Sequence, residues 1–328
     1  MNTKRSEFTP FITVIITAYN RMEFVMRAIE SVSEQTLSRD FFEILVARNF
    51  SDDEIDRFAV NNGARLIGLP QCSIGEMMQL GLNDARGSLI CFLDDDDLFS
   101  KDKLKRVYDT FSKFPDVGFY KHQFEYIDTA GNRLHRLTEE RHISNFKGAE
   151  YFLIRDSEKL SKISQYSLIG PDMNISTMCI RKDVLSSVRN YLESVTFLSD
   201  TFLLAASLIS PYSLFFDSAS LSSYRVHSKS TSRQRRPYHS NPDMEMILEM
   251  MASRGKSEFA FFYRQKEAVG KIIALIEMQK SNRVEMIKLL FNFLSSKTLH
   301  DPKSELWAAK LAILYLFSPK AALRIKNR

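Results

Sequence analysis

The feature that most constrains the fold is a series of short apolar runs that alternate with longer amphipathic segments. Four runs have the length of a buried strand: Phe11–Ala18, Glu43–Ala47, Ala64–Leu69 and Leu89–Leu93. Beside them, apolar residues recur at helical spacing in Arg21–Thr36, Glu76–Ala85 and Lys101–Phe114. Strands that alternate with helices in this way predict an α/β fold, in which a doubly wound, mostly parallel sheet is flanked by helices.

The rest of the chain divides into two regions of different pattern. Further strands are expected at Phe119–Ile127, Ser176–Ile180 and Leu214–Tyr224, with helices at Lys182–Tyr191 and Phe202–Leu208. After Pro237 the pattern is helical, over Asp243–Met251, Glu258–Met278, Arg283–Phe293 and Lys303–Phe317. We therefore expect one α/β domain over residues 1–236, with halves at about 8–115 and 116–236, and a helical C-terminal region over 237–328.

Composition excludes some classes of function. The 328 residues carry 45 basic and 40 acidic side chains, and the net charge of +5 is too small to indicate a nucleic-acid-binding chain. The three cysteines, Cys72, Cys91 and Cys179, lie too far apart for a zinc site or a disulfide framework. Because the chain also shows no signal peptide and no run of membrane-span length, we expect a cytoplasmic protein in a reducing compartment.

Two basic clusters and one apolar segment suggest contact with an anionic surface. The clusters lie over 229–236 and 320–328, and they suit phosphate or an anionic membrane, or are simply solvated. The segment Leu306–Phe317 contains Trp307 and Tyr315 and precedes the second cluster. Such a helix resembles an interfacial anchor. Peripheral association with the inner face of the cell membrane is therefore one expectation, and a homodimer contact is the other.

Polar residues follow three of the predicted strands. The clusters are Tyr19–Arg21, Arg48–Asp53 and Asp94–Asp97. In open α/β sheets, ligands bind beyond the carboxyl ends of the strands. The sequence therefore predicts a binding site where these three clusters meet.

The run of four aspartates, Asp94–Asp97, is the strongest chemical signal in the chain. Adjacent carboxylates repel one another, and burying them without a partner would be costly. A divalent cation such as Mg²⁺ or Mn²⁺ prefers carboxylate oxygens and commonly binds one or two carboxylates together with substrate phosphates. The alternative is an acidic helix start at the surface, and Asp97 in particular is expected to cap the following helix.

Several motifs, taken in order, resemble the family 2 glycosyltransferases of the GT-A fold. They are Thr17–Arg21 (TAYNR), Ser31–Thr36 (SVSEQT), Asn83–Asp97 (NDARGSLICFLDDDD), Ser176–Leu185 (STMCIRKDVL) and Tyr224–His227 (YRVH). The resemblance runs from about Phe11 to Ser232. It implies an enzyme of glycan biosynthesis that uses a nucleotide-diphosphate sugar as donor, Mn²⁺ or Mg²⁺ as cofactor, and a glycan or lipid-linked acceptor.

The resemblance also implies roles for residues on the donor side. It places Tyr19 against the nucleotide, with Thr17 and Arg21 nearby. Asp94 would contact the ribose or the metal region. Asp95 is the variable middle residue of the family's D-x-D element and is grouped with the donor contacts.

The same resemblance assigns metal and catalytic roles. Asp96 matches the last carboxylate of the D-x-D element and would be the principal metal ligand, with His227 approaching the diphosphate or the metal. Arg225, in the YR-x-H motif, would contact the donor. Asp200 matches the family's general base, although Ser199 stands where the family has a glutamate. Taken alone, Asp200 could instead cap the helix beginning at Phe202, and His227 could be a structural surface residue.

The second strand end departs from the family pattern. The family has two aspartates there for the base, and this chain has Arg48 and Asn49. Asn49 can still hydrogen-bond a base edge, and Phe50 could stack on it. Asp52 and Asp53 follow closely and are alternative base contacts.

The sequence favours a metal-dependent, inverting glycosyltransferase that moves a sugar to an acceptor hydroxyl or phosphate. A nucleotidyltransferase of sugar phosphates is an alternative, but such enzymes need a glycine-rich N-terminal loop, and Thr17–Arg21 contains no glycine. A non-catalytic nucleotide-sugar-binding protein is the other alternative, supported by the altered Arg48-Asn49 pair.

Overall fold

The computed structural model describes residues 11–19, 21–68, 71–135, 146, 148–162, 174–228, 242–256, 259, 272, 276, 283–294 and 302–318. The chain forms two compact units. The first comprises Met1–Lys159 and Leu168–Ser230, and the second comprises Leu160–Ser167 and Thr231–Arg328. The second unit thus takes a short segment from the middle of the chain, which the sequence pattern does not indicate.

Within the described residues, nine strands form one sheet in the first unit, in the order β3-β2-β1-β4-β8-β6-β9-β5, with β7 also paired to β9. The first four strands in this order are parallel to one another and run over β1 (Ile12–Ala18), β2 (Phe42–Arg48), β3 (Ala64–Ile67) and β4 (Leu89–Asp94). Strands β1, β2 and β4 are almost completely buried because helices cover both faces, which is why their sequences read as continuous apolar runs, whereas β3 is mostly half-buried. These strands confirm the predicted α/β class.

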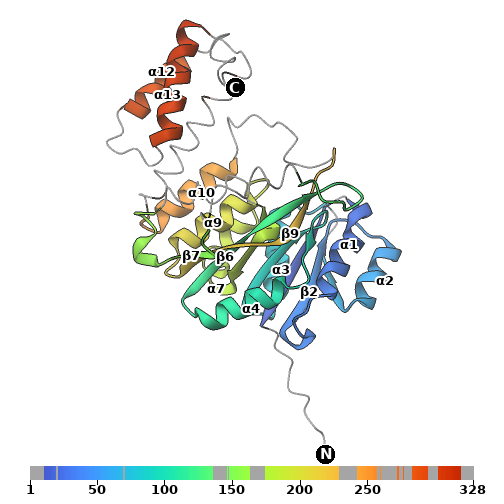
Figure 1. Cartoon of the computed structure of the whole chain (residues 1–328). Helices are drawn as coiled ribbons and strands as arrows, with labels where there is room; N and C mark the ends of the chain where they lie inside the picture. Colours follow the sequence, from blue (N-terminus) through green and yellow to red (C-terminus); the bar gives the residue numbers. More distant parts are fainter. Residues whose placement is uncertain are drawn as a thin grey trace, which may run out of the picture. The chain divides into compact units, whose positions relative to one another are not determined.

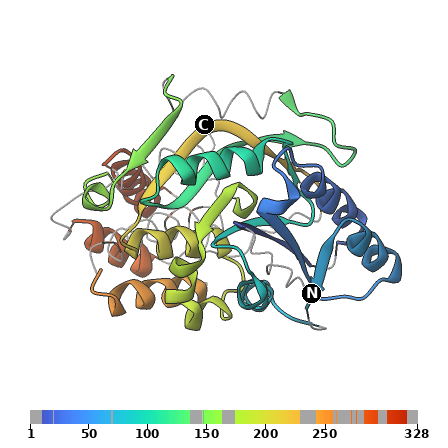
Figure 2. The same cartoon turned by 90° about the horizontal axis from the view of Figure 1, so that it is seen from below.

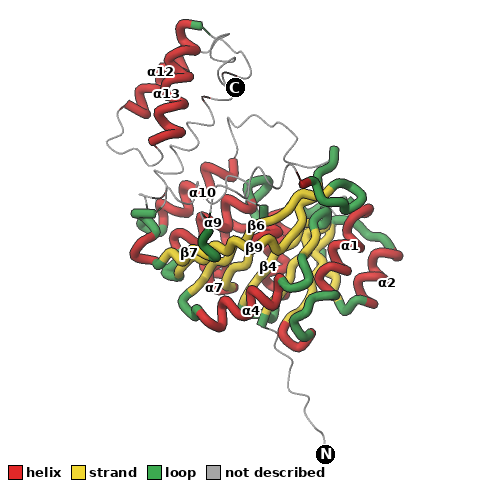
Figure 3. The backbone as a smooth tube through the Cα atoms, viewed as in Figure 1, coloured by secondary structure: helices red, strands yellow, loops and turns green. Residues whose placement is uncertain are grey.

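The other half of the sheet is mixed. β8 (Met178–Arg181) runs antiparallel to β4 and to β6 (Val117–Ile127), and β6 is parallel to the long strand β9 (Ser213–Arg225). Two short strands, β5 (Leu98–Phe99) and β7 (Tyr151–Ile154), pair antiparallel with β9. Figure 3 shows the strands as one continuous layer between helices. Because β5 directly follows the residues after β4, its pairing with β9 places the end of β9 beside Asp94–Asp97.

Helices of the first unit cover the two faces of the sheet. They are α1 (Met22–Ser33), α2 (Asp53–Asn61), α3 (Ile74–Asp84), α4 (Lys103–Lys113), α7 (Lys182–Ser187), α8 (Arg189–Leu192) and α9 (Ser199–Ile209). Helices α1, α2 and α4 share one apolar core with Val14 and Ile16 of β1, whereas Ile15 faces α3 at Gly81. In Figure 2 the teal helix α4 and the yellow-green helices α7 and α9 lie on opposite sides of the sheet.

One described α-helix, α2, and two described strands, β5 and β7, were not predicted. Helix α2 buries only Ile55 and Ala59, so its sequence shows little apolar periodicity, although Asp52 caps it by accepting hydrogen bonds from the backbone N–H groups of Glu54 and Ile55. Strands β5 and β7 are too short to show a pattern of their own. Because β5 follows the aspartates, the next helix begins only at Lys103, with Asp102 as its N-cap residue. The expectation that Asp97 caps this helix is therefore wrong.

A close backbone approach explains the glycine in the Arg86-Gly87 pair. The Gly87 N–H donates to Thr13 Oγ1 at 2.9 Å, and Thr13 Oγ1 donates to Glu43 Oε1 at 2.8 Å. The Arg86 N–H donates to the same Glu43 oxygen at 2.6 Å. A Cβ atom on Gly87 would lie 2.6 Å from the Thr13 backbone nitrogen, which is inside van der Waals contact. The chain can therefore enter β4 beside β1 only without a side chain at this position.

The second unit is helical where it is described. Its helices are α10 (Pro242–Ser253), α12 (Arg283–Leu294) and α13 (Pro302–Phe317). Helices α12 and α13 lie side by side (Figure 1) and share an apolar core that includes Met286, Leu311 and Tyr315. Most of the helix expected over Glu258–Met278 lies outside the described residues. Among those described, no helix combines the length and hydrophobicity needed to cross a bilayer.

Substituting Gly87 with alanine should destabilise the first unit, because the added Cβ meets the backbone of β1. Overpacking of this kind typically lowers the free energy of unfolding by about 1–3 kcal/mol. Urea denaturation followed by circular dichroism measures the change. Arg86→Ala removes an exposed neighbouring side chain and should change stability by no more than about 0.5 kcal/mol. Equal midpoints for both variants would contradict the close approach at Gly87.

Candidate functional site

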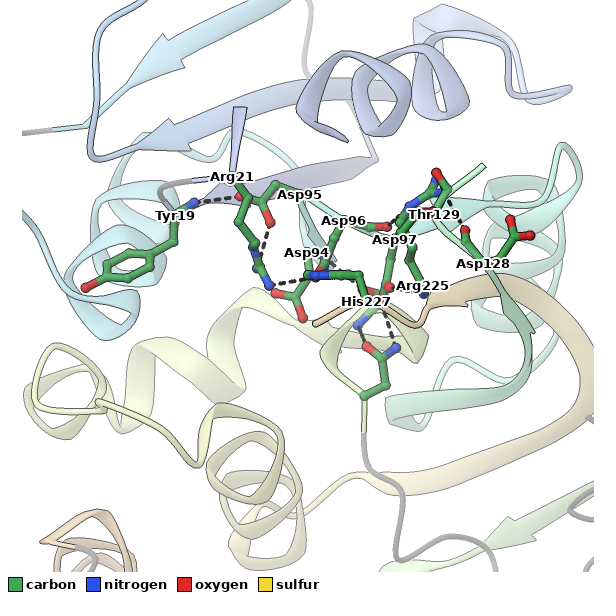
Figure 4. A network of polar contacts seen from close by, with 12 residues as sticks. Tyr19, Arg21, Asp94, Asp95, Asp96, Asp97, Asp128, Thr129, Arg225 and His227 are labelled. Carbon is green, nitrogen blue, oxygen red and sulfur yellow. Dashed lines mark hydrogen bonds and ion pairs between the residues drawn. The ribbon is translucent and has the colours of Figure 1, made fainter. Parts of the chain in front are cut away.

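The register of the sheet brings two of the predicted polar clusters together. Thr17 lies opposite Asp94 across the β1–β4 pair, and Ala18 lies opposite Arg48 across the β1–β2 pair. The carboxyl ends of β1, β2 and β4 therefore share one edge of the sheet, as the alternating pattern predicts. Figure 4 shows the side chains that gather there.

The first two aspartates are held by the chain that follows β1. The Thr17 hydroxyl donates to Asp94 Oδ1 at 3.1 Å, and the Tyr19 N–H donates to Asp95 Oδ2 at 2.8 Å. Arg21 forms an ion pair with Asp95, with 2.6 Å between its Nη2 and Asp95 Oδ1. The Tyr19 ring is 45% exposed and points away from the aspartates (Figure 4). Its backbone, rather than its ring, belongs to the carboxylate cluster.

The last two aspartates are held from three elements. Asp96 Oδ2 lies 2.6 Å from Arg21 Nη1 and 2.8 Å from His227 Nε2. Asp97 Oδ1 accepts a hydrogen bond from the Arg225 N–H at 3.0 Å, and Asp97 Oδ2 accepts one from Asn174 Nδ2 at 2.7 Å. Sequence segments near residues 21, 174 and 226 thus converge on one acidic turn.

Arg225 is fully buried beneath this turn. Its Nε donates to the Asp96 carbonyl oxygen at 2.8 Å, and its Nη1 donates to the carbonyl oxygens of Asp128 and Thr129 at 2.9 and 3.1 Å. The guanidinium also lies 4.8 Å from the centre of the Phe24 ring. These contacts hold the backbone of the aspartate turn, Asp94–Asp97, in place from its buried side.

Burial of several like charges shifts the acid–base properties of the cluster. Burial, with the negative charge of Asp96, raises the pKa of Asp94 to about 6. Burial, with the charges of Asp96 and Asp94, raises the pKa of Asp97 to about 8. Burial also raises the pKa of Asp95, although the positive charge of Arg21 opposes the shift. Without a further cation, the cluster therefore holds protons that isolated aspartates would have lost.

A buried lysine lies behind the aspartates. Lys103 Nζ donates to the Ser176 carbonyl oxygen at 2.6 Å and lies 3.3 Å from the centre of the Phe99 ring. Ser176 Oγ in turn accepts a hydrogen bond from the Asp94 N–H at 3.0 Å. Burial lowers the pKa of Lys103 to about 7. The lysine supports the segment to which the first aspartate is attached.

Three of the carboxylates fit a divalent cation. Asp94, Asp96 and Asp97 each offer a ligand oxygen, and these oxygens lie within 4.8 Å of one another. An all-oxygen, multiply charged donor set suits Mg²⁺ or Mn²⁺, and the raised pKa values of Asp94 and Asp97 show that the cluster lacks positive charge. His227, predicted as a ligand, lies outside this group of three and contacts Asp96 instead.

Asp200 lies in the first turn of α9, which begins at Ser199. Its Oδ1 accepts hydrogen bonds from the Thr201 N–H at 2.5 Å and the Thr201 hydroxyl at 3.2 Å. The N-cap residue is Leu198, so Asp200 does not cap a helix that starts at Phe202. The negative charge of Asp200 contributes to the raised pKa of Asp94, which places the two carboxylates within electrostatic reach of each other.

The end of β2 is organised differently from the aspartate turn. Arg48 forms an ion pair with Asp56 of α2, with 2.7 Å between Nη2 and Oδ2, and also donates to the Phe50 carbonyl oxygen. Asp52 is occupied as the N-cap of α2. Asn49 is half-buried, and its backbone N–H donates to the Ala18 carbonyl oxygen at 3.3 Å.

Sequence reasoning missed several supporting residues. Asn174, Ser176 and Lys103 contact the aspartate turn or its neighbours from other segments. Ser176 begins the motif Ser176–Leu185, but the motif gave it no role at the aspartates, and no motif marks Asn174 or Lys103. In the sequence, Lys103 is indistinguishable from an exposed helical lysine, and only the tertiary structure shows that it is buried. The basic clusters over 229–236 and 320–328 lie outside the described residues.

The raised pKa of Asp97 predicts that the metal-free protein loses stability as the pH rises from about 4 to about 8. The folded carboxyl binds its proton more tightly than the unfolded one, whose pKa is 3.8, so its contribution is complete below that value and is lost through the folded pKa. Asp97→Asn should flatten this dependence, and Mn²⁺ should stabilise the wild type more at high pH because it binds the ionised form.

Urea denaturation at several pH values, with EDTA and with Mn²⁺, measures this effect. Lys103 acts in the opposite direction above about pH 7, so the informative quantity is the difference between wild type and Asp97→Asn. Asp109→Asn, at an exposed carboxylate of α4, is the matched control and should keep the wild-type pH dependence. An equal slope for wild type and Asp97→Asn would argue against a proton buried at this position.

The first unit is similar in sequence to known glycosyltransferases. Residues 13–171 match glycosyl transferase family 2. An uncharacterised glycosyltransferase of Rickettsia prowazekii is 24% identical over 232 residues, which is 70% of this chain and 68% of that protein.

Solved structures share the fold at low sequence identity. TarS of S. aureus superposes with a TM-score of 0.63 at 14% identity, over 95% of this chain and 54% of TarS. The mannosyltransferase PcManGT of Pyrobaculum calidifontis, solved in complex with GDP-Man and Mn²⁺, gives a TM-score of 0.55 at 14% identity, over 98% of this chain and 88% of PcManGT. Together with the motifs and the strand order, these matches show that residues 13–171 are similar to glycosyl transferase family 2 and that the chain shares the fold of these solved structures.

Proposed function

We propose that the domain transfers a sugar from a nucleotide-diphosphate sugar to an acceptor hydroxyl or phosphate, with inversion and with a divalent cation. The observation that carries the proposal is the group of three carboxylate oxygens from Asp94, Asp96 and Asp97, within 4.8 Å of one another at the carboxyl edge of the sheet. TarS has been solved with UDP-GlcNAc and PcManGT with GDP-Man. These complexes support a nucleotide-sugar donor for this chain as well.

On the donor side, we assign the nucleotide to the surface formed by the ends of β1 and β2. The exposed ring of Tyr19 offers a stacking face, and Asn49 offers an amide to the base edge. Thr17 holds Asp94 toward the ribose. Because Arg48 is paired with Asp56, we assign it to shaping this surface and not to the contact that the family's aspartate makes.

The departing nucleoside diphosphate gains negative charge, and the cluster supplies positive groups to meet it. A cation bound by Asp94, Asp96 and Asp97 would supply Lewis-acid stabilisation of that charge. Arg21 and His227 border Asp96 and are the side chains available to the diphosphate. Arg225 is buried against the Asp96 carbonyl oxygen, so we assign it to positioning the turn in place of the donor contact expected from its motif.

On the acceptor side, we assign the general base to Asp200. An acceptor hydroxyl is a weak nucleophile until a positioned carboxylate removes its proton. The oxygen then attacks the anomeric carbon as the bond to the diphosphate breaks, and the proton remains on Asp200. Attack opposite the leaving group inverts the anomeric centre, so the stereochemistry of the product tests this part of the proposal.

The test measures release of nucleoside diphosphate from a panel of UDP- and GDP-sugars, with Mn²⁺ or with EDTA. Asp200→Asn should lower transfer by about 10²- to 10⁴-fold while donor binding, followed by thermal shift, persists. Asp96→Asn should abolish the stimulation by Mn²⁺. Asp109→Asn changes an exposed carboxylate and should leave turnover unchanged.

Turnover that is equal with Mn²⁺ and EDTA, or unaffected by Asp96→Asn, would contradict the metal-dependent mechanism. Release of pyrophosphate from a nucleoside triphosphate would favour a nucleotidyltransferase. Donor binding without turnover of any sugar would favour a non-catalytic binding protein.

We further propose that α13 brings the enzyme to an anionic membrane surface. Ala308, Leu311 and Tyr315 are buried in the helix pair, yet Leu306 and Ile313 are 51% and 48% exposed. The outer side of this helix thus combines the apolar Leu306 and Ile313 with the exposed Lys310, a combination of apolar and basic side chains that suits an anionic bilayer surface. A lipid-linked acceptor would suit an enzyme held in this way.

Co-sedimentation with anionic vesicles tests the membrane proposal. The wild type should bind vesicles that contain phosphatidylglycerol and bind neutral vesicles more weakly, and Leu306→Glu should reduce binding because it places a charge on the apolar surface. Val60→Glu, at a 59% exposed position of α2, is the control and should bind normally. A dimer that Leu306→Glu dissociates, with no vesicle binding, would instead identify the surface as a subunit contact.

A further inference from the structure

Arg21 already serves as a cation for the aspartate cluster. Its guanidinium spans two carboxylates, with 2.6 Å to Asp95 Oδ1 and 2.6 Å to Asp96 Oδ2. Figure 4 shows the side chain reaching from the end of β1 across the aspartate turn. The Arg21 side chain is only 16% exposed, so water screens these contacts little. The two ion pairs therefore neutralise part of the charge that a divalent cation would otherwise meet.

The two cations would compete for the same carboxylate. Asp96 Oδ2 has two lone pairs, and its neighbours at hydrogen-bond distance are Arg21 Nη1 and His227 Nε2. Asp96 is also one of the three carboxylates that fit a metal. A divalent ion bound at about 2.0–2.2 Å from these oxygens would lie close to the guanidinium and be repelled by it. As long as Arg21 contacts Asp96, its positive charge therefore opposes the binding of a metal ion at this carboxylate.

The Arg21 guanidinium is not fully satisfied by its carboxylates. Its Nε–H is buried and has no hydrogen-bond acceptor among the described residues. A buried donor without an acceptor raises the free energy of the conformation that contains it. Arginine binds phosphate oxygens bidentately with geometry that matches its fork. A diphosphate beside the turn would offer Arg21 the acceptors that the carboxylates do not.

We propose that Arg21 is the resting counter-ion of the site and that the divalent cation enters together with the nucleoside diphosphate. The diphosphate draws the guanidinium away from Asp95 and Asp96, and the freed Asp96 carboxylate then binds the cation. Nucleotide and cation thus strengthen each other's binding by the same factor. This inference rests on the proposed function, since it takes the donor to be a nucleotide-diphosphate sugar.

The experiment measures Mn²⁺ binding to the full chain by electron paramagnetic resonance of free Mn²⁺, alone and with UDP or GDP. For the wild type we expect weak binding of Mn²⁺ alone and binding at least about 10-fold tighter with one of the nucleotides. Arg21→Gln should bind Mn²⁺ alone about 10-fold more tightly than the wild type and should lose most of the dependence on nucleotide.

Two further variants make the comparison specific. Arg27→Gln removes an exposed positive charge from α1, the helix that begins directly after Arg21, where Arg27 Nη1 donates to the Ala130 carbonyl oxygen at 3.3 Å. This variant should bind Mn²⁺ as the wild type does. Arg21→Lys keeps the charge but lacks the fork that spans two carboxylates, and it should have an intermediate affinity for Mn²⁺. It also provides the test if Arg21→Gln, which leaves Asp95 without its ion pair, does not fold.

The outcomes separate this inference from the proposed function. If Mn²⁺ binds and Asp96→Asn abolishes binding, but Arg21→Gln and Arg21→Lys bind it as the wild type does, the role of Arg21 is wrong and the metal site stands. If neither nucleotide strengthens Mn²⁺ binding by the wild type, the coupled entry is wrong. If Mn²⁺ binds in no condition to any variant, the metal-dependent function fails, and this inference fails with it.

Discussion

The arrangement of the first unit depends on how the charge of Asp94–Asp97 is balanced at the edge of the sheet. The four neighbouring carboxylates are largely removed from water at this edge. Burying an ionised carboxylate without a hydrogen-bond or ion-pair partner costs free energy. The structure surrounds them with Arg21 and His227 on one side and Asn174 with the buried Arg225 on the other. Even so, Asp94 and Asp97 keep raised pKa values. The residual negative charge is what makes the turn a candidate cation site and not merely a polar loop.

The topology of the sheet supplies these partners. β1 and β4 lie side by side, so the segment after β1 reaches the aspartates directly. The long strand β9 leaves the sheet next to β5 and carries Arg225 and His227 to the same turn. The segment before β8 adds Asn174 and Ser176. A site made from four distant segments can be stiff, because each contributes a contact that is anchored in the core.

The surface proposed for the nucleotide lies between the aspartate turn and the end of β2, and these two places have different side-chain partners. At the aspartate turn, the residues expected from the family motifs are present and mutually bonded. At the end of β2, Arg48 is engaged by Asp56 and Asp52 by the start of α2. The family's aspartates at this position are thus replaced by residues with structural partners of their own. This is why the base is assigned above, as a proposal, to Tyr19 and Asn49 and not to Arg48 or Asp52.

The sequence by itself determined the parallel strands, the helices between them except α2, the edge of the sheet at which the candidate site lies, and the aspartates within it. These features depend on local periodicity and on the order of elements, which a sequence records directly. The tertiary structure alone decided that Arg225 is buried, that Lys103 lies behind the turn, that Asp97 joins the carboxylates and caps no helix, and that Arg21 spans Asp95 and Asp96. The physical reason is that burial and charge pairing depend on which distant segments meet, and local patterns carry no information about those encounters.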